Sequence, residues 1–187
     1  MPPSSSKTKT RCAWCSDDPL YVAYHDIEWG VPLHDDQKLF ELLLLEGFQA
    51  GLSWITVLRK RETFRRAFHQ FDAERIAAFT PAELDALAQD TGIIRNKLKI
   101  AASVTNAKAY LAVGKDYNSF DAFLWSFAPT KKTTPETRAT SPESDRMSKE
   151  LLRHGFKFVG STICYAFMQA AGLVDDHSRD CWKYRPR

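Results

Sequence analysis

The sequence contains no apolar run long enough to span a membrane, and its first residues do not form a signal peptide. We therefore expect a cytoplasmic protein that has no membrane partner. Long alternations of β-branched and polar residues are absent, and so are internal repeats, which argues against β-sheet and solenoid architectures. Hydrophobic residues make up 44% of the 187 positions, enough for one full core. These absences predict an all-α protein, which we expect to be a monomer.

A large excess of charge is also absent. The formal net charge is +3 at pH 7, and Lys7 and Lys9 supply two of these charges. Both lie in a polar N-terminal stretch that contains proline and serine. We predict that residues 1–10 form a disordered tail and residues 11–187 a single helical domain. A nearly neutral domain can bind DNA only through a local basic patch and backbone donors, not through a global field.

The most informative stretch, residues 39–60, combines two apolar helices with one carboxylate. Asp35 and Ser53 are suitable N-caps for the two helices, and a turn at residues 47–51, bounded by glycines, separates them. Glu46 interrupts the apolar pattern at the end of the first helix. A buried carboxylate is costly unless it finds a partner. Glu46 is therefore either a solvent-exposed residue at a helix end or a recognition group in a pocket.

Aromatic side chains are concentrated in residues 11–30, which contain Trp14, Tyr21, Tyr24 and Trp29. One interpretation is a small aromatic core that closes one end of the domain. The other is a wall for a flat ligand, and the two are compatible.

A turn led by Gly92 separates a helix that ends near Asp90 from a long helix over residues 98–113. This arrangement is similar to a helix-hairpin-helix. Gly92 would let the backbone approach a phosphate, and the start of the second helix would offer free N–H groups, with charge from Lys97 and Lys99. The alternative is an ordinary helical hairpin without a DNA role.

Cysteine is scarce, and four cysteines in a cytosolic chain are more often metal ligands or core residues than disulfides. His177 and Cys181 are four residues apart, so one helical turn can place both on the same side. Tetrahedral zinc takes four nitrogen or sulfur ligands. Two sets fit: Cys12, His25, His177 and Cys181, or Cys12, Cys15, His177 and Cys181. The Cys12–Cys15 spacing favours the second set, and scattered residues without a metal are the third possibility. Cys164, within an apolar helix, is expected to be a core residue.

Assembled, these features resemble the 3-methyladenine DNA glycosylase I family. The resemblance covers residues 11–181 and rests on specific motifs, which are RCAW, DPLYVAYHDIEWGVP, LLEGFQAGLSWITVLRKRE, TGIIRNKLKI, FLWSF, GFKFVGSTICYAFMQAAGLVDDH and the final His177-x3-Cys181. It implies an all-helical, helix-hairpin-helix DNA repair glycosylase in which one structural zinc ion joins the two chain ends. By this resemblance the zinc ligands are Cys12, His25, His177 and Cys181, and Cys15 is a bystander.

The resemblance also implies an activity, which is hydrolysis of the N-glycosidic bond of 3-methyladenine in alkylated double-stranded DNA, with release of the free base. Glu46 is implied as the catalytic residue. The residues implied to bind the flipped base are Tyr24, Glu46, Trp54, Trp14, Trp29 and Tyr21. Those implied to contact DNA are Leu52, Gly51, Gly92, Ile94 and Lys97. N3-methylated adenine is cationic in DNA, so it suits aromatic faces and a carboxylate, and it leaves without a strong general acid.

Asp116 and Asp121 follow the long helix, but neither lies in a pattern that recommends it as a catalytic acid, and no lysine is indicated as a lyase nucleophile.

Two rival functions come from other classes. A zinc-stapled DNA-binding module without catalysis would explain the hairpin and the metal, but not a carboxylate among aromatics. A zinc hydrolase needs an open metal position, which four protein ligands would close.

Overall fold

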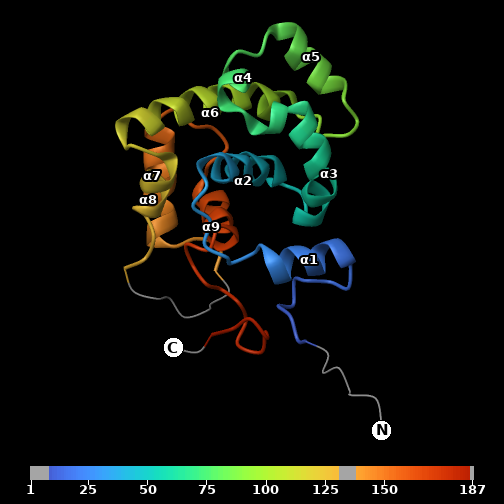
Figure 1. Cartoon of the computed structure of the whole chain (residues 1–187), viewed down its shortest axis with the longest axis vertical. Helices are drawn as coiled ribbons and strands as arrows, with labels where there is room; N and C mark the ends of the chain where they lie inside the picture. Colours follow the sequence, from blue (N-terminus) through green and yellow to red (C-terminus); the bar gives the residue numbers. More distant parts are fainter. Residues whose placement is uncertain (1–8, 131–137, 186–187) are drawn as a thin grey trace.

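The computed structural model describes residues 9–130 and 138–185, and these are helical without a strand (Figure 1). The helices are α1 (Pro19–Ile27), α2 (Asp36–Gln49), α3 (Trp54–Ala67), the short 3₁₀ helix η1 (His69–Phe71), α4 (Ala73–Ala77), α5 (Pro81–Gln89), α6 (Lys97–Asp116), α7 (Phe120–Trp125), α8 (Pro142–Arg153) and α9 (Ser161–Ala170). The predicted all-α class is therefore confirmed for the described ranges. Within them, no helix is both long and apolar enough to cross a membrane.

Helix α2 lies at the centre and packs against α3, α6, α7 and α9 (Figure 1). Its apolar side chains are buried, except for the partly buried Leu42, as the sequence pattern predicts. Asp35 caps it, as predicted, by accepting a hydrogen bond from the Lys38 N–H at 2.9 Å. Asp36 also reaches the start of α7, where its carboxylate accepts the N–H groups of Phe120 and Asp121 at 3.1 and 2.8 Å. One acidic pair therefore begins α2 and fixes α7 to it.

Two local expectations about the centre of the chain are wrong. Gly47 does not begin a turn, because α2 continues to Gln49 and the turn starts only at Ala50. Ser53 occupies the N-cap position of α3, but its hydroxyl makes no capping hydrogen bond and pairs instead with the Thr56 hydroxyl at 2.8 Å.

The two ends of the described chain lie together below α1 and α9 (Figure 1). The Trp182 N–H donates to the Thr10 carbonyl at 2.9 Å, and the Lys9 ammonium lies 3.8 Å from the Trp182 ring. Lys183 donates to three carbonyls at the end of α1, those of His25, Asp26 and Trp29. Residues 1–8, most of the predicted tail, lie outside the described residues, as do residues 131–137 between α7 and α8.

Candidate functional site

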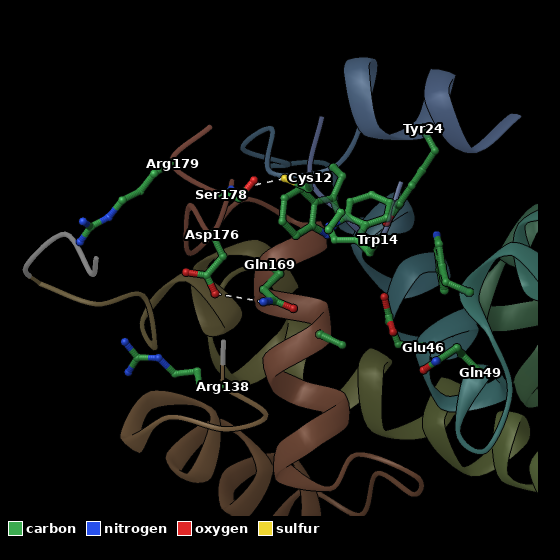
Figure 2. Close-up of a pocket in the computed structure, with 14 residues that line it drawn as sticks. Cys12, Trp14, Tyr24, Glu46, Gln49, Arg138, Gln169, Asp176, Ser178 and Arg179 are labelled. Carbon is green, nitrogen blue, oxygen red and sulfur yellow. Dashed lines mark hydrogen bonds between the residues drawn. The ribbon is translucent and has the colours of Figure 1, made fainter. Parts of the chain in front are cut away.

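A cavity of about 580 Å³ lies between the N-terminal segment, α2, the start of α3, α9 and the C-terminal segment. It is lined by Cys12, Ala13, Trp14, Tyr24, Trp29, Glu46, Gln49, Trp54, Arg138, Ala166, Gln169, Asp176, Ser178 and Arg179. Figure 2 shows Glu46 and Gln49 of α2 on one side, near the Trp14 and Tyr24 rings, and Asp176, Arg138 and Arg179 on the other. The cavity therefore has an aromatic half with a carboxyl group and a second, more polar half.

Glu46 is buried in the wall of this cavity, with 4% of its surface exposed. The interpretation of Glu46 as a solvent-exposed residue at a helix end is therefore wrong. Among the described residues no donor or cation pairs with its carboxyl group, and burial raises its pKa to about 8. The side chain is then mostly protonated at pH 7 in the empty protein, which avoids the cost of an unpaired buried charge.

The aromatic residues predicted around Glu46 form two groups in contact. The Tyr24 and Trp54 ring centroids are 5.5 Å apart. The Trp14 ring lies 5.0 Å from Trp29 and 5.1 Å from Tyr21. Of the six residues predicted to bind a base, five line the cavity: Trp14, Tyr24, Trp29, Glu46 and Trp54. Tyr21 does not line it and instead supports the Trp14 ring from behind.

The polar half of the cavity was not predicted from the sequence. Asp176 is fixed there, because one carboxylate oxygen accepts the Tyr165 hydroxyl at 2.5 Å and the Gln169 amide at 3.0 Å. Its other oxygen is buried without a partner among the described residues. Ala166 and Gln169 are three apart on α9, which is the one spacing signal that could have placed them on a common face.

The turn after α2 presents Leu52, whose surface is 43% exposed. Gly51 has a φ of +85°, a conformation that glycine adopts without strain. The Gln49 amide donates to the Leu52 carbonyl at 2.7 Å, and the Leu52 N–H donates back to the Gln49 carbonyl at 2.7 Å. Because Gln49 also lines the cavity, the exposed turn and the cavity wall share one side chain.

The expectation that Lys99 adds free charge to the hairpin is wrong. Lys99 is buried, and its ammonium donates to the carbonyls of Phe48 and Ala50 at 3.0 and 2.8 Å, at the end of α2. Desolvation lowers its pKa. A cation at the negative end of a helix is favourable, so Lys99 closes α2 and ties the first turn of α6 to the turn that carries Leu52.

The link between α5 and α6 spans residues 90–96, and the Asn96 side chain caps α6 by accepting the Lys99 N–H at 3.1 Å. Lys97 is exposed at the start of α6, whereas Ile94 packs partly on the core. The Gly92 N–H donates to the Asp90 carboxylate at 2.7 Å and is not free for a phosphate. The requirement for glycine at position 92 has a local reason, since a Cβ there would lie 2.2 Å from Thr63 Cγ2.

We therefore expect Gly92→Ala to lower the melting temperature, at a cost on the order of 1–3 kcal/mol for an overpacked contact. Thermal unfolding of the variant and the parent measures this. Gly114→Ala on α6 is the matched control, because a Cβ at Gly114 meets no atom within 4 Å. Thr63→Ser removes Cγ2 and should restore part of the loss in the double variant. Equal melting temperatures for Gly92→Ala and Gly114→Ala would contradict the clash.

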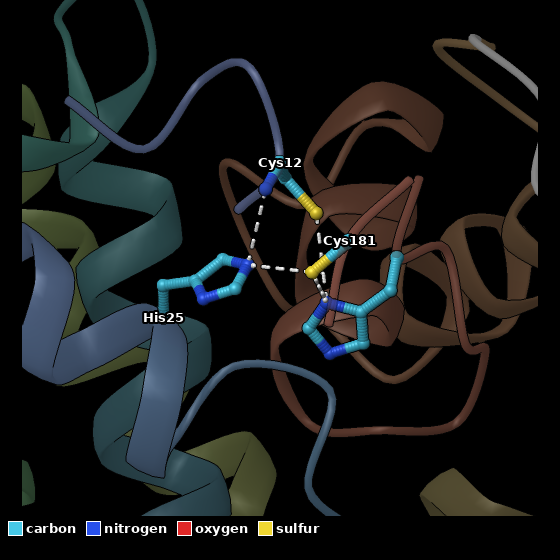
Figure 3. Close-up of side chains that lie close together, drawn as sticks. Cys12, His25 and Cys181 are labelled. Carbon is cyan, nitrogen blue, oxygen red and sulfur yellow. Dashed lines mark hydrogen bonds between the residues drawn. The ribbon is translucent and has the colours of Figure 1, made fainter. Parts of the chain in front are cut away.

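A second feature lies beside the cavity, where four buried side chains from both chain ends meet (Figure 3). They are Cys12, His25, His177 and Cys181, whose donor atoms all lie within 4.8 Å of one another. Cys12 Sγ is 3.5 Å from His177 Nδ1, and Cys181 Sγ is 3.4 Å from His25 Nε2. Ligands of a tetrahedral zinc ion lie about 3.3–3.8 Å apart, given zinc–ligand bonds of about 2.0–2.3 Å. The four donors therefore fit such an ion in number and chemistry, and these two sulfur–nitrogen pairs also have its spacing.

The surroundings orient these donors. His25 Nδ1 lies 2.9 Å from the Asp26 carboxylate, and the Arg11 guanidinium beside Asp26 holds the pKa of that carboxyl well below its usual range. This is the carboxylate–histidine arrangement that fixes a metal-binding imidazole. Burial lowers the pKa of His177 to about 4, so its ring is neutral, as a ligand must be. Gly30 has a φ of +74°, and a Cβ there would lie 2.9 Å from His177 Nε2.

Cys15 is not part of this cluster, so the set that its spacing with Cys12 favoured does not form. Its thiol points to the backbone oxygens of Ser16 and Tyr21 at 3.6 and 3.7 Å. Cys164 is fully buried in the core of the domain, as predicted.

Comparison with known proteins agrees with this geometry. The methyladenine glycosylase family profile matches residues 14–184. DNA-3-methyladenine glycosylase 1 of Escherichia coli K12 is 53% identical over 180 residues, which cover 93% of this chain and 96% of that protein. A crystal structure of 3-methyladenine DNA glycosylase I has a TM-score of 0.90 at 52% identity, covering 94% of this chain and all of the other. The Staphylococcus aureus 3-methyladenine DNA glycosylase I, from a structure on 3-methyladenine recognition, has a TM-score of 0.88 at 37% identity, covering 95% and 97%. The chain therefore belongs to the methyladenine glycosylase family.

Proposed function

We propose that this protein removes 3-methyladenine from alkylated DNA by hydrolysing its N-glycosidic bond, as the first step of base excision repair. The observation that carries the proposal is the buried Glu46 carboxyl group, unpaired among Trp14, Tyr24 and Trp54 in a cavity large enough for a base. The named activity of the relatives, at about half identity over most of the chain, supports it.

The chemistry of the lesion suits this cavity. A flipped base needs stacking on its faces and hydrogen bonds at its edge. Trp54 provides a face, and Tyr24 and Glu46 provide the edge, while Trp14 and Trp29 close the space. Methylation at N3 makes the base cationic in DNA, so its arrival favours the ionised form of Glu46. The positive charge also makes the base a good leaving group, and water completes the hydrolysis.

The DNA duplex would be held from two elements. Leu52, exposed at the turn after α2, would fill the space that the flipped nucleotide leaves, with Gly51 allowing the turn. The segment around residues 92–97 would act as the hairpin of a helix-hairpin-helix. Lys97 and the free N–H groups at the start of α6 would face the phosphate backbone. The Gly92 contribution would be the packing that shapes this segment.

The cluster of two cysteines and two histidines would hold one structural zinc ion. A zinc ion with four protein ligands supplies no open position for water, so its chemical contribution is to join the chain ends. Cys12 and Ser178 line the cavity, and the Ser178 N–H donates to Cys12 Sγ at 3.4 Å. One proposed ligand, Cys12, and Ser178, the neighbour of another, therefore also form part of the wall of the base cavity.

Release of free 3-methyladenine from methylated duplex DNA, with zinc-loaded protein, tests the proposal. We expect release of the free base that depends on the cavity and leaves an abasic site. A DNA-binding module would bind the duplex without releasing base. A zinc hydrolase would lose its activity on metal removal even where the fold survives. Absence of base release by folded, zinc-loaded protein would overturn the proposed function.

A further inference from the structure

Phe158 has a strained backbone conformation and a partly exposed ring. Its backbone φ is +57°, a left-handed conformation that a bulky side chain rarely adopts. Its surface is nevertheless 39% exposed, although its neighbours Phe156 and Val159 are buried. Strain of this kind persists only where the surrounding structure imposes it, and it is concentrated at functional sites. Burial of the ring does not offset the free-energy cost of this backbone conformation, because much of the residue remains exposed to water.

The conformation is imposed from both sides. The buried Asn106 of α6 binds the preceding residue twice, donating to the Lys157 carbonyl at 3.1 Å and accepting the Lys157 N–H at 2.7 Å. On the other side, the Val159 carbonyl accepts the thiol of the buried Cys164 at 3.2 Å. The backbone is therefore held firmly while the ring is left outside, which is how a side chain is presented to a partner.

The position of Phe158 indicates what that partner is. The Lys99 ammonium, which closes the end of α2 beside the Leu52 turn, lies 5.9 Å from the centre of the Phe158 ring. The Phe158 backbone also rests against α2, because a Cβ added at Gly47 would lie 3.4 Å from the Phe158 carbonyl oxygen. Exposed Phe158 and exposed Leu52 therefore adjoin the same end of α2. Lys99, which closes this end of α2, and Asn106, which holds the residue before Phe158, both belong to α6.

We propose that Phe158 is a further DNA-contacting side chain, which packs on the bases or sugars next to the gap that Leu52 enters. The proposal rests on the proposed function, because it takes Leu52 as the residue that enters the duplex. Apolar side chains that insert at base steps and aromatic rings that stack on bases are established ways of holding distorted DNA. The exposed Lys157 beside it adds a positive charge that suits the phosphate backbone.

The test compares Phe158→Gly, Phe158→Tyr and the parent in binding to a duplex that contains an abasic-site analogue, measured by fluorescence anisotropy at fixed salt. Glycine accepts the positive φ, so Phe158→Gly removes the ring without adding strain. We expect Phe158→Gly to bind about tenfold more weakly and Phe158→Tyr to bind like the parent. Leu152→Ala on α8, where the side chain is 52% exposed, is the control and should change nothing.

Affinity for free 3-methyladenine separates this proposal from the proposed function, and it should be the same in the parent and Phe158→Gly. Parent-like DNA binding by Phe158→Gly would overturn the DNA contact, and so would an equal loss of free-base binding, which would indicate a disturbed cavity. A parent dimer in sedimentation that Phe158→Gly dissociates would overturn it too, because a second copy would then cover the ring. Weaker DNA binding by Phe158→Gly in a protein that releases no base would support the contact and refute only the activity.

Discussion

Glu46→Gln should weaken the binding of 3-methyladenine by roughly tenfold to a hundredfold, on the order of 1–3 kcal/mol, as expected for a mismatched buried hydrogen bond. The substitution keeps the shape of the side chain but removes the carboxylate that a cationic base and its N–H donors would favour. Isothermal titration with the free base and single-turnover release from methylated DNA measure the two consequences.

The size of this effect should depend on pH. With its pKa raised to about 8, Glu46 is mostly neutral at pH 6 in the empty protein, so parent and variant are then most alike. Base release by the parent should rise towards pH 8, as the cost of ionising Glu46 disappears, and Glu46→Gln should lack this rise. A variant that binds the base as tightly as the parent at pH 8.5 would contradict a recognition role for Glu46.

Stability should change in the opposite direction. Because the folded-state pKa of Glu46 lies above its ordinary value of 4.5, the folded protein binds the proton more tightly than the unfolded chain. The contribution to the free energy of unfolding is therefore fully present below pH 4.5 and is lost as the pH rises through about 8. Glu46→Gln removes this loss, so the variant should gain stability relative to the parent over that range. Glu62→Gln, at an exposed position on α3, is the control for removal of a carboxylate.

Removing one proposed zinc ligand should have the largest effect on stability. Cys181→Ser should lose the bound metal and lower the melting temperature by about 10 °C or more, because a structural zinc site contributes folding free energy directly. Metal analysis and thermal unfolding, with and without a chelator, measure this. The loss should extend to base binding, since Cys12 lines the cavity.

Cys15→Ser is the matched control for Cys181→Ser, because Cys15 lies outside the cluster. It should retain the metal and the parent melting temperature, whereas His25→Ala should lose both. Retention of the metal by His25→Ala together with its loss in Cys15→Ser would contradict the ligand set.

The residues that could be predicted from the sequence carry local signals. Asp35 precedes an apolar helix, and Glu46 breaks an apolar run. Each signal lies within a few residues of its consequence. The choice of His25 over Cys15 as a member of the metal cluster came from family resemblance, because spacing alone favoured Cys15.

The predictions that failed depend on contacts between distant segments. Lys99 resembles a surface charge in the sequence, but packing of α6 against the end of α2 buries it on two carbonyls. The close packing of Gly92 is also invisible in the local sequence, because the atom nearest to an added Cβ belongs to Thr63 of α3. The polar half of the cavity combines Gln169 and Asp176 with Arg138, and no local sequence pattern predicts that these residues line one cavity.

The meeting of the two chain ends has a consequence for biosynthesis. Cys12 and His177 are separated by 165 positions, which a ribosome that adds about 5–20 residues per second covers in roughly 10–30 s. Throughout that time the N-terminal segment lacks the histidine and cysteine against which Cys12 is fixed, so Trp14 has no defined place in the cavity wall. A nascent or truncated chain therefore lacks part of the cavity wall, and only a molecule translated to Cys181 has the complete lining of the cavity.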